Sequence, residues 1–101
     1  MRMSVNIHLY LDIENLASAE EADTVGATVE ELFKEHGIES WMYVGVFHDP
    51  PKVLTSSEHG PIIITGFGRW SEQFESDVTT AIGAVAPKAR IDLKWDYPDE
   101  R

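Results

Sequence analysis

The fold is decided by the stretch VNIHLYLDIE, which occupies residues 5–14. Apolar and polar side chains alternate along it. One side carries Val5, Ile7, Leu9, Leu11 and Ile13, and the other carries Asn6, His8, Tyr10, Asp12 and Glu14. A period of two residues over this length predicts a β-strand with one buried face and one open face.

A helix is predicted from Ser18 to His36. Ser18 and Glu21 have the spacing of a capping box, in which the glutamate returns to the backbone of the serine. Gly37 supplies a left-handed stop, and Ile38 supplies the apolar contact that follows such a stop. One apolar stripe recurs at intervals of three and four, as a half-buried helix requires: Ala22, Val25, Val29, Leu32, Phe33 and His36.

The rest of the chain predicts three more strands and a second helix. Trp41, Tyr43 and Phe47 are expected to share one face of their strand, and proline and glycine pairs mark the loop that follows. The predicted elements are a strand over 39–47, a loop over 48–61, a strand over 62–69, a helix from Ser71 to Ala86 and a strand over 90–97.

The order strand, helix, strand, strand, helix, strand is typical of the ferredoxin-like βαββαβ plan. We therefore expect an α+β fold, with a four-stranded antiparallel sheet and two helices on one face. At 101 residues the chain is expected to form a single domain over residues 1–101.

Composition limits the classes of partner. The net charge is −10 and the eight basic residues are scattered, which argues against nucleic acid and against anionic membrane surfaces. The chain has no cysteine, so a disulfide framework and a thiolate metal site are excluded. No apolar run approaches the ~18 residues of a membrane span, and no secretion segment is recognised, so we expect a cytoplasmic protein.

Most of the negative charge falls on the two predicted helices, which together carry −8. Acids in a first helical turn favour the helix dipole, and this accounts for Glu20, Glu21, Asp23, Glu72 and Glu75. It does not account for Glu30, Glu31 and Glu35, which lie near the C-terminal end of the first helix. These three are the predicted partner-binding acids, and a merely solvated helix face is the alternative.

The sheet face away from the helices is predicted to be rich in aromatic side chains. Trp41, Tyr43 and Phe67 are its predicted partner-binding residues, because an apolar area of that size is rarely left in water. A symmetric homodimer through this face is expected. The whole predicted face comprises Asn6, His8, Tyr10, Asp12, Trp41, Tyr43, Phe47, Ile63, Thr65, Phe67, Arg69, Asp92, Lys94 and Asp96.

Two carboxylates, Asp12 and Glu14, stand at the end of the first strand. A strand end can fix a carboxylate against a hard cation. Residues 9–16 resemble the first acidic motif of PIN-like nucleases, and the strand-end aspartate resembles that of the small CRISPR-associated nucleases. Either resemblance implies a metal-dependent nuclease. Both families need a basic nucleic-acid surface that this composition lacks, so solvated carboxylates are the preferred interpretation.

Another four residues could hold zinc if the loop over 48–61 closed as a hairpin: His48, Asp49, Glu58 and His59. Their spacing is not specific for a metal, so we predict an ordinary loop and no metal or other cofactor. His8 is expected to contact a neighbouring polar group rather than act as a general base, since no nucleophile is identifiable.

Residues 62–78, with Phe67, Trp70 and Phe74, resemble the strand-to-helix segment of dimeric α+β barrel monooxygenases. The resemblance implies a sheet-to-sheet dimer that binds small aromatic substrates without a metal. It would place Asn6, His8, Tyr10 and Trp70 near a pocket.

The preferred function is a small acidic protein-binding module, of the inhibitor or immunity type, that blocks a basic site on a partner. No catalytic residue is assigned. The alternative is the small cofactor-independent enzyme, or a small-molecule binder built on the same plan. A closed apolar pocket would favour that alternative, and a solid core with an acidic patch would favour the binder.

Overall fold

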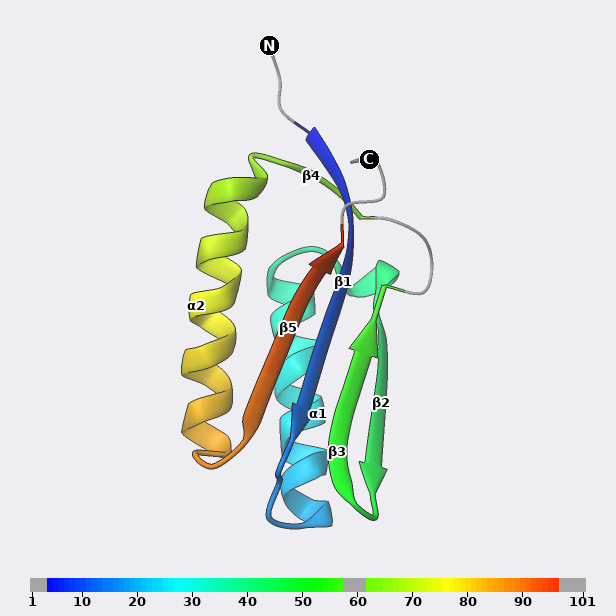
Figure 1. Cartoon of the computed structure of the whole chain (residues 1–101), viewed down its shortest axis with the longest axis vertical. Coiled ribbons are helices and arrows are strands. Elements are labelled where there is room, and N and C mark those ends of the chain that lie inside the picture. The colour runs from blue at the N-terminus through cyan, green and yellow to red at the C-terminus, as the bar shows by residue number, and fades with distance from the viewer. Residues whose placement is uncertain (1–3, 58–61, 97–101) are drawn as a thin grey trace.

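The computed structural model describes residues 4–57 and 62–96, and Figure 1 shows a sheet with two long helices. The predicted α+β class is confirmed. The elements in chain order are β1 (Ser4–Glu14), α1 (Ala19–Glu35), the 3-10 turn η1 (Glu39–Trp41), β2 (Tyr43–His48), β3 (Pro51–Ser56), β4 (Ile62–Thr65), α2 (Phe67–Val85) and β5 (Arg90–Asp96).

The central strand of the antiparallel sheet is β1. Its residues 10–13 pair with β3 and its residues 8–14 pair with β5, so these two neighbours occupy opposite edges of β1. Its residues 4–7 pair with β4, and β2 pairs with β3. The sheet therefore has five strands, and it matches the predicted four-stranded ferredoxin-like order only in part.

The predicted loop over 48–61 is wrong for His48, which ends β2, and for residues 51–56, which form β3. Asp49 and Pro50 make the turn after β2, and Pro51 is the first residue of β3, a strand position that tolerates proline. Buried Val53 and Thr55 then alternate with half-buried neighbours. The prolines thus mark a hairpin turn. Residues 58–61 lie outside the described residues.

The predicted strand over 62–69 is wrong beyond residue 65. Gly66 adopts a left-handed φ of 72°, and α2 begins at Phe67 rather than after a cap at Ser71. The rings of Phe67, Trp70 and Phe74 stack in series. Their spacing of three and four residues is helical, so burial of these rings together favours the earlier helix start.

The predicted strand over 39–47 begins later than expected. Residues 39–41 form η1, and Trp41 lies half-buried there against the core. Tyr43 and Phe47 belong to β2 and point away from the helices. The prediction that all three aromatic side chains share one strand face is therefore wrong for Trp41, because its backbone is not extended.

The core lies between the sheet and the helices, which both cover one face as predicted (Figure 1). Phe33 of α1 and Phe74 of α2 stack at its centre with ring centroids 6.2 Å apart. The predicted inward side of β1 is confirmed for the four of its members whose side chains are described. The fifth member, Val5, lies outside the described side chains. Those four, all fully buried, are Ile7, Leu9, Leu11 and Ile13.

Both ends of α1 form as the sequence predicts. Ser18 Oγ accepts a hydrogen bond of 3.1 Å from the Glu21 backbone N–H. The Glu21 carboxylate accepts from the Ala17 N–H at 2.8 Å, one residue before the expected one. Gly37 has a φ of 73°, and Ile38 is buried after it. Within the described ranges neither helix is long and apolar enough to cross a membrane.

Candidate protein-binding surfaces

The C-terminal half of α1 presents three glutamates to solvent. Val25, Val29, Leu32 and Phe33 fix the buried side of the helix, and the three predicted acids Glu30, Glu31 and Glu35 are all exposed. Among the described residues none of the three has a basic group within ion-pair distance, even though Lys34 stands beside them in sequence. Their charge is therefore not neutralised within the described part of the molecule.

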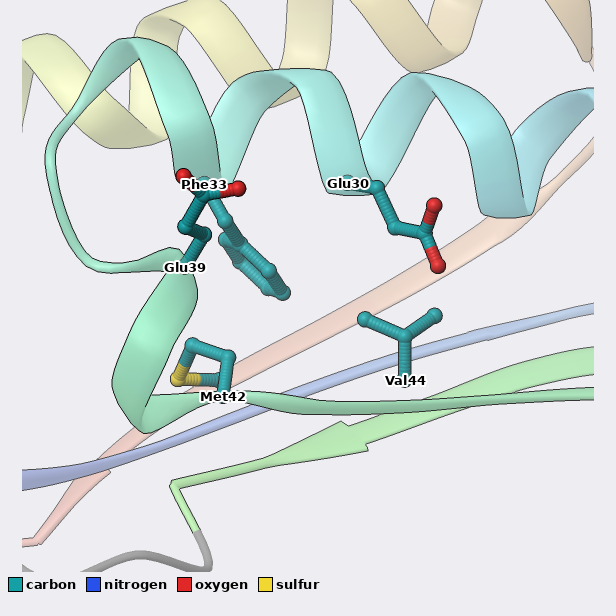
Figure 2. A pocket seen from close by; sticks show the side chains of 5 residues that line it. All are labelled: Glu30, Phe33, Glu39, Met42 and Val44. Atoms are coloured by element: carbon teal, nitrogen blue, oxygen red, sulfur yellow. The ribbon is translucent and has the colours of Figure 1, made fainter.

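Glu30 also borders a hollow of about 220 Å³ between α1 and β2. Figure 2 shows its side chain pointing from the helix toward Val44, while the Phe33 ring reaches into the gap above Met42. Glu39 of η1 stands at the other end. An apolar floor with carboxylates at its rim suits the alkyl stem and charged head of a lysine or arginine.

Three of the other helix acids are engaged in long-range contacts. Asp23 lies 2.8 Å from His48 Nε2, Asp77 lies 3.0 Å from His36 Nε2, and Glu75 accepts from the Trp95 indole N–H at 2.9 Å. Because α2 begins at Phe67, its first turn contains no acid. The predicted dipole role of Glu72 and Glu75 is therefore wrong.

The longer α2 also changes the charge of the helix layer. It includes Arg69, so the two helices together carry −7 rather than the predicted −8. The acids that remain without a described partner are concentrated toward the end of α1. This is the region that the sequence singled out, and the engaged acids lie at the start of α1 and on α2.

The open sheet face combines a charged half and an aromatic half. Two shallow hollows meet there and share Tyr10 and Asp12 as lining residues. One continues over the charged side chains of β5, and the other over Tyr43, Phe47 and Leu54. The prediction of an open face with aromatic character is thus confirmed for β2, although its membership differs.

The predicted set Trp41, Tyr43 and Phe67 is not brought together. Tyr43 is exposed on the open face, and Trp41 packs against the core. Phe67 lies in the first turn of α2 and contacts Trp70 and Trp95, with centroids 6.5 and 5.1 Å away. The helical spacing of Phe67, Trp70 and Phe74 is the signal that could have placed Phe67 correctly.

Asp12 faces another acid across the sheet. It is the direct cross-strand neighbour of Asp92 on β5, an arrangement in which like charges repel. Partial burial raises the pKa of Asp12 above its ordinary value of 3.8, and the charges of Asp92 and Glu14 raise it further. A hydrogen bond from the Thr55 backbone and the charge of Lys52 act in the opposite direction.

The candidate metal ligands are not assembled among the described residues. No group of three or more acids or histidines that could hold a metal is found in that part of the chain. His48 pairs with Asp23 of α1. Glu58 and His59, the other half of the predicted set, lie outside the described residues.

The pocket implied by the monooxygenase resemblance does not form from its described members. His8 and Tyr10 project from the open face of β1, whereas Trp70 packs beside Phe74 on the helix side of the sheet. The predicted polar contact of His8 is present, since its Nδ1 lies 3.2 Å from Ser57 Oγ. The side chain of Asn6, the fourth member, is not among those described.

Sequence reasoning missed the contact between His36 and Asp77 and the role of Gly45. A Cβ atom added at Gly45 would lie 3.1 Å from Tyr43 Cε2 and 3.2 Å from Phe47 Cε1, so the two rings close over the glycine. The alternation of Tyr43, Gly45 and Phe47 on one strand face could have indicated that the two rings pack over the glycine.

Comparison of the chain with models of protein families, with curated proteins and with solved structures finds no match.

Proposed function

We propose that this protein is a small acidic protein-binding module whose α1 surface engages a basic site on a partner protein, in the manner of an inhibitor or immunity protein. The observation that carries the proposal is the set of exposed glutamates 30, 31 and 35, which have no described basic partner. Negative charge at the C-terminal end of a helix opposes the helix dipole. Local stability therefore does not explain these acids.

The hollow beside Glu30 supports the same proposal. Its apolar floor of Phe33, Met42 and Val44 gives a basic side chain somewhere to bury its stem, and Glu30 and Glu39 give it counter-charges. Charge complementarity of this kind raises the association rate and the specificity more than the affinity itself. Long-range steering also weakens as salt is added.

The test is the association rate of a synthetic oligolysine peptide with the purified chain at low and at physiological ionic strength. Reversing Glu30, Glu31 and Glu35 together to lysine should slow association by about tenfold or more at low salt, and by less at high salt. The matched control reverses Glu72, Asp92 and Asp96, which changes the net charge equally at other surfaces. Equal rates for the two triple variants would reject the α1 surface as the binding site.

We further propose that two copies of the chain associate through the aromatic part of the open sheet face. The support is the exposure of Tyr10, Tyr43, Phe47 and Ile63 on one side of the sheet. Symmetric dimers are the commonest way to cover such a surface. Sedimentation at micromolar concentration tests the association, and a species of 11.4 kDa alone would contradict it.

A further inference from the structure

One outer edge of the described sheet lacks the charged side chains and prolines that commonly prevent strand addition. β2 pairs with β3 on one side, and no described strand pairs with its other side. Its residues 43–47 contain no charge and no proline. The opposite edge strand β5 carries Arg90, Asp92, Lys94 and Asp96. Charged side chains on an edge strand are a common protection against further pairing, so only the β5 edge is protected in this way.

This edge also carries most of the large hydrophobic side chains that are exposed among the described residues. Five large hydrophobic side chains of the described residues are exposed, and three of them belong to β2. Tyr43 is 50% exposed, Phe47 43% and Val46 38%. Tyr43 and Phe47 project from the open face, whereas Val46 projects toward α1 beside Gly26. Exposed apolar groups thus flank this edge on both faces of the sheet.

The sequence of this edge is symmetric about its central glycine. Residues 43–47 read Tyr-Val-Gly-Val-Phe, with an aromatic residue at each end and a valine on each side of Gly45. We propose that two copies of the chain pair antiparallel along β2, about a two-fold axis at Gly45, to form one continuous sheet. This arrangement joins the edges of two β2 strands and leaves the open face of β1 and β4 uncovered, so it differs from the face-to-face homodimer proposed above. It is also independent of the acidic α1 surface.

The pairing would match side chains on both faces. Tyr43 would stand opposite Phe47 of the second copy on the open face, and aromatic cross-strand pairs stabilise antiparallel sheets. Val44 would stand opposite Val46 of the second copy on the helix face. Gly45 would face its own copy, and the two rings that already close over it would shield the glycine backbone on the open face.

The expected dimer is reversible and salt-dependent. A contact built on one six-residue strand is expected to bury less than the roughly 1,200 Å² that stable interfaces start from. Each copy carries a net charge of −10, so added salt should strengthen self-association by screening the repulsion. Binding of a basic partner to α1 should instead weaken with salt, which separates the two proposals experimentally.

The first experiment is sedimentation equilibrium of the full chain at low and high salt. A monomer–dimer equilibrium that shifts toward dimer as salt rises supports the inference. A protein that stays monomeric up to millimolar concentration at high salt overturns it. If that monomer still binds an oligolysine peptide, the acidic-surface proposal stands while the pairing of two copies fails.

The second experiment uses the absence of cysteine from the chain. Tyr43→Cys and Phe47→Cys variants, carrying tags of different mass, are mixed and oxidised. Directly opposed antiparallel residues have Cα atoms about 4.5–5.5 Å apart, which suits a disulfide. The matched control mixes Asp92→Cys with Asp96→Cys, which have the same spacing on β5.

Cross-linking between cysteines 43 and 47 should far exceed cross-linking of either variant with itself and that of the control mixture. Equal yields in the two mixtures would overturn the pairing. Because the aromatic rings contribute to the contact, Val44→Cys mixed with Val46→Cys provides a second opposed pair that keeps both rings. A dimer by sedimentation in which neither opposed pair cross-links preferentially would show that the copies associate elsewhere, which also overturns the pairing.

Discussion

His36 Nε2 lies 3.0 Å from Asp77 Oδ2, and this contact joins the end of α1 to the middle of α2. The imidazole side chain is only 12% exposed. It packs edge-on against Trp70 and Phe74, with ring centroids 5.7 and 5.1 Å away. Asp77 also accepts a hydrogen bond from Gln73 at 2.9 Å. The two helices are thus held by a polar contact at the edge of an aromatic cluster.

Replacing Asp77 with alanine should lower the free energy of unfolding by about 1 kcal/mol, because His36 then loses its hydrogen-bond partner in a largely buried position. The partial exposure of Asp77 keeps the expected effect at the low end. Denaturant unfolding measures it. The exposed Glu72, on the same helix, is the control, and Glu72→Ala should change stability little. Equal effects of the two substitutions would mean that the contact between His36 and Asp77 is not stabilising.

The two helices contain a pair of glycines with opposite surroundings. A Cβ atom at Gly26 of α1 would lie 2.5 Å from Val46 Cγ2, whereas a Cβ atom at Gly83 of α2 meets nothing within 4 Å. Gly26→Ala should therefore destabilise by about 1–3 kcal/mol through overpacking. Gly83→Ala should stabilise by about 0.5–1 kcal/mol through helix propensity. Thermal unfolding of both variants tests the close approach of α1 to β2, which a gain of stability in Gly26→Ala would contradict.

The sequence predicted those elements whose local pattern and tertiary contacts agree. β1 alternates and is half-buried, and Ser18 and Gly37 bound α1 as their capping chemistry requires. The missed elements depend on longer-range contacts. Strand β3 is short, and its pairing with β1 and β2 decides its structure. The start of α2 depends on burying Phe67 with Trp95, a residue of β5.

The candidate site residues also divide into those that local sequence pattern predicts and those that depend on long-range contacts. The exposure of Glu30, Glu31 and Glu35 followed from the helical periodicity, which fixes the outward side of α1. The partners of Asp23 and Asp77 could not be predicted from the helical periodicity. Each partner is a histidine distant in the sequence that packing brings close. The aromatic face was misassigned where one helix start was misplaced, since that moved Phe67 to the other side of the sheet.

Asp12→Asn should stabilise the protein at neutral pH. Burial and the neighbouring acids raise the pKa of Asp12 in the folded state, so the folded state holds this proton more strongly than the unfolded state does. The contribution of Asp12 to stability therefore falls as pH rises through the folded pKa, and its ionised form is unfavourable at neutral pH. Asparagine removes that charge and can still accept the hydrogen bond from Thr55.

Denaturant unfolding of the Asp12→Asn variant and the wild type over a pH series measures this effect. The advantage of the variant should shrink as pH falls through the folded pKa, and it should vanish well below pH 3.8, where Asp12 is protonated in both states. Asp96→Asn, an exposed substitution on β5, controls for the loss of one negative charge. An advantage that does not change with pH would show that the acid pair is not its cause.

The chain should not bind duplex DNA or RNA at physiological salt. The two helices carry a net charge of −7. The basic side chains on the open face, Lys52, Arg90 and Lys94, stand among acidic ones. Release of counterions from phosphates therefore cannot drive association. A gel-shift assay is the measurement. Sub-micromolar affinity would contradict the prediction and would return attention to the strand-end carboxylates Asp12 and Glu14.

The three α1 glutamates should prove dispensable for folding. Glutamate and lysine have similar helix propensities, and lysine near a helix C-terminus interacts favourably with the dipole by about 0.3–1 kcal/mol per residue at low salt. Reversing Glu30, Glu31 and Glu35 also lowers the net negative charge and so reduces self-repulsion. The free energy of unfolding of the triple variant should therefore equal or exceed that of the wild type, with the gain largest at low salt. A marked loss of stability would assign these acids a structural role and would remove the main support for the proposed binding function.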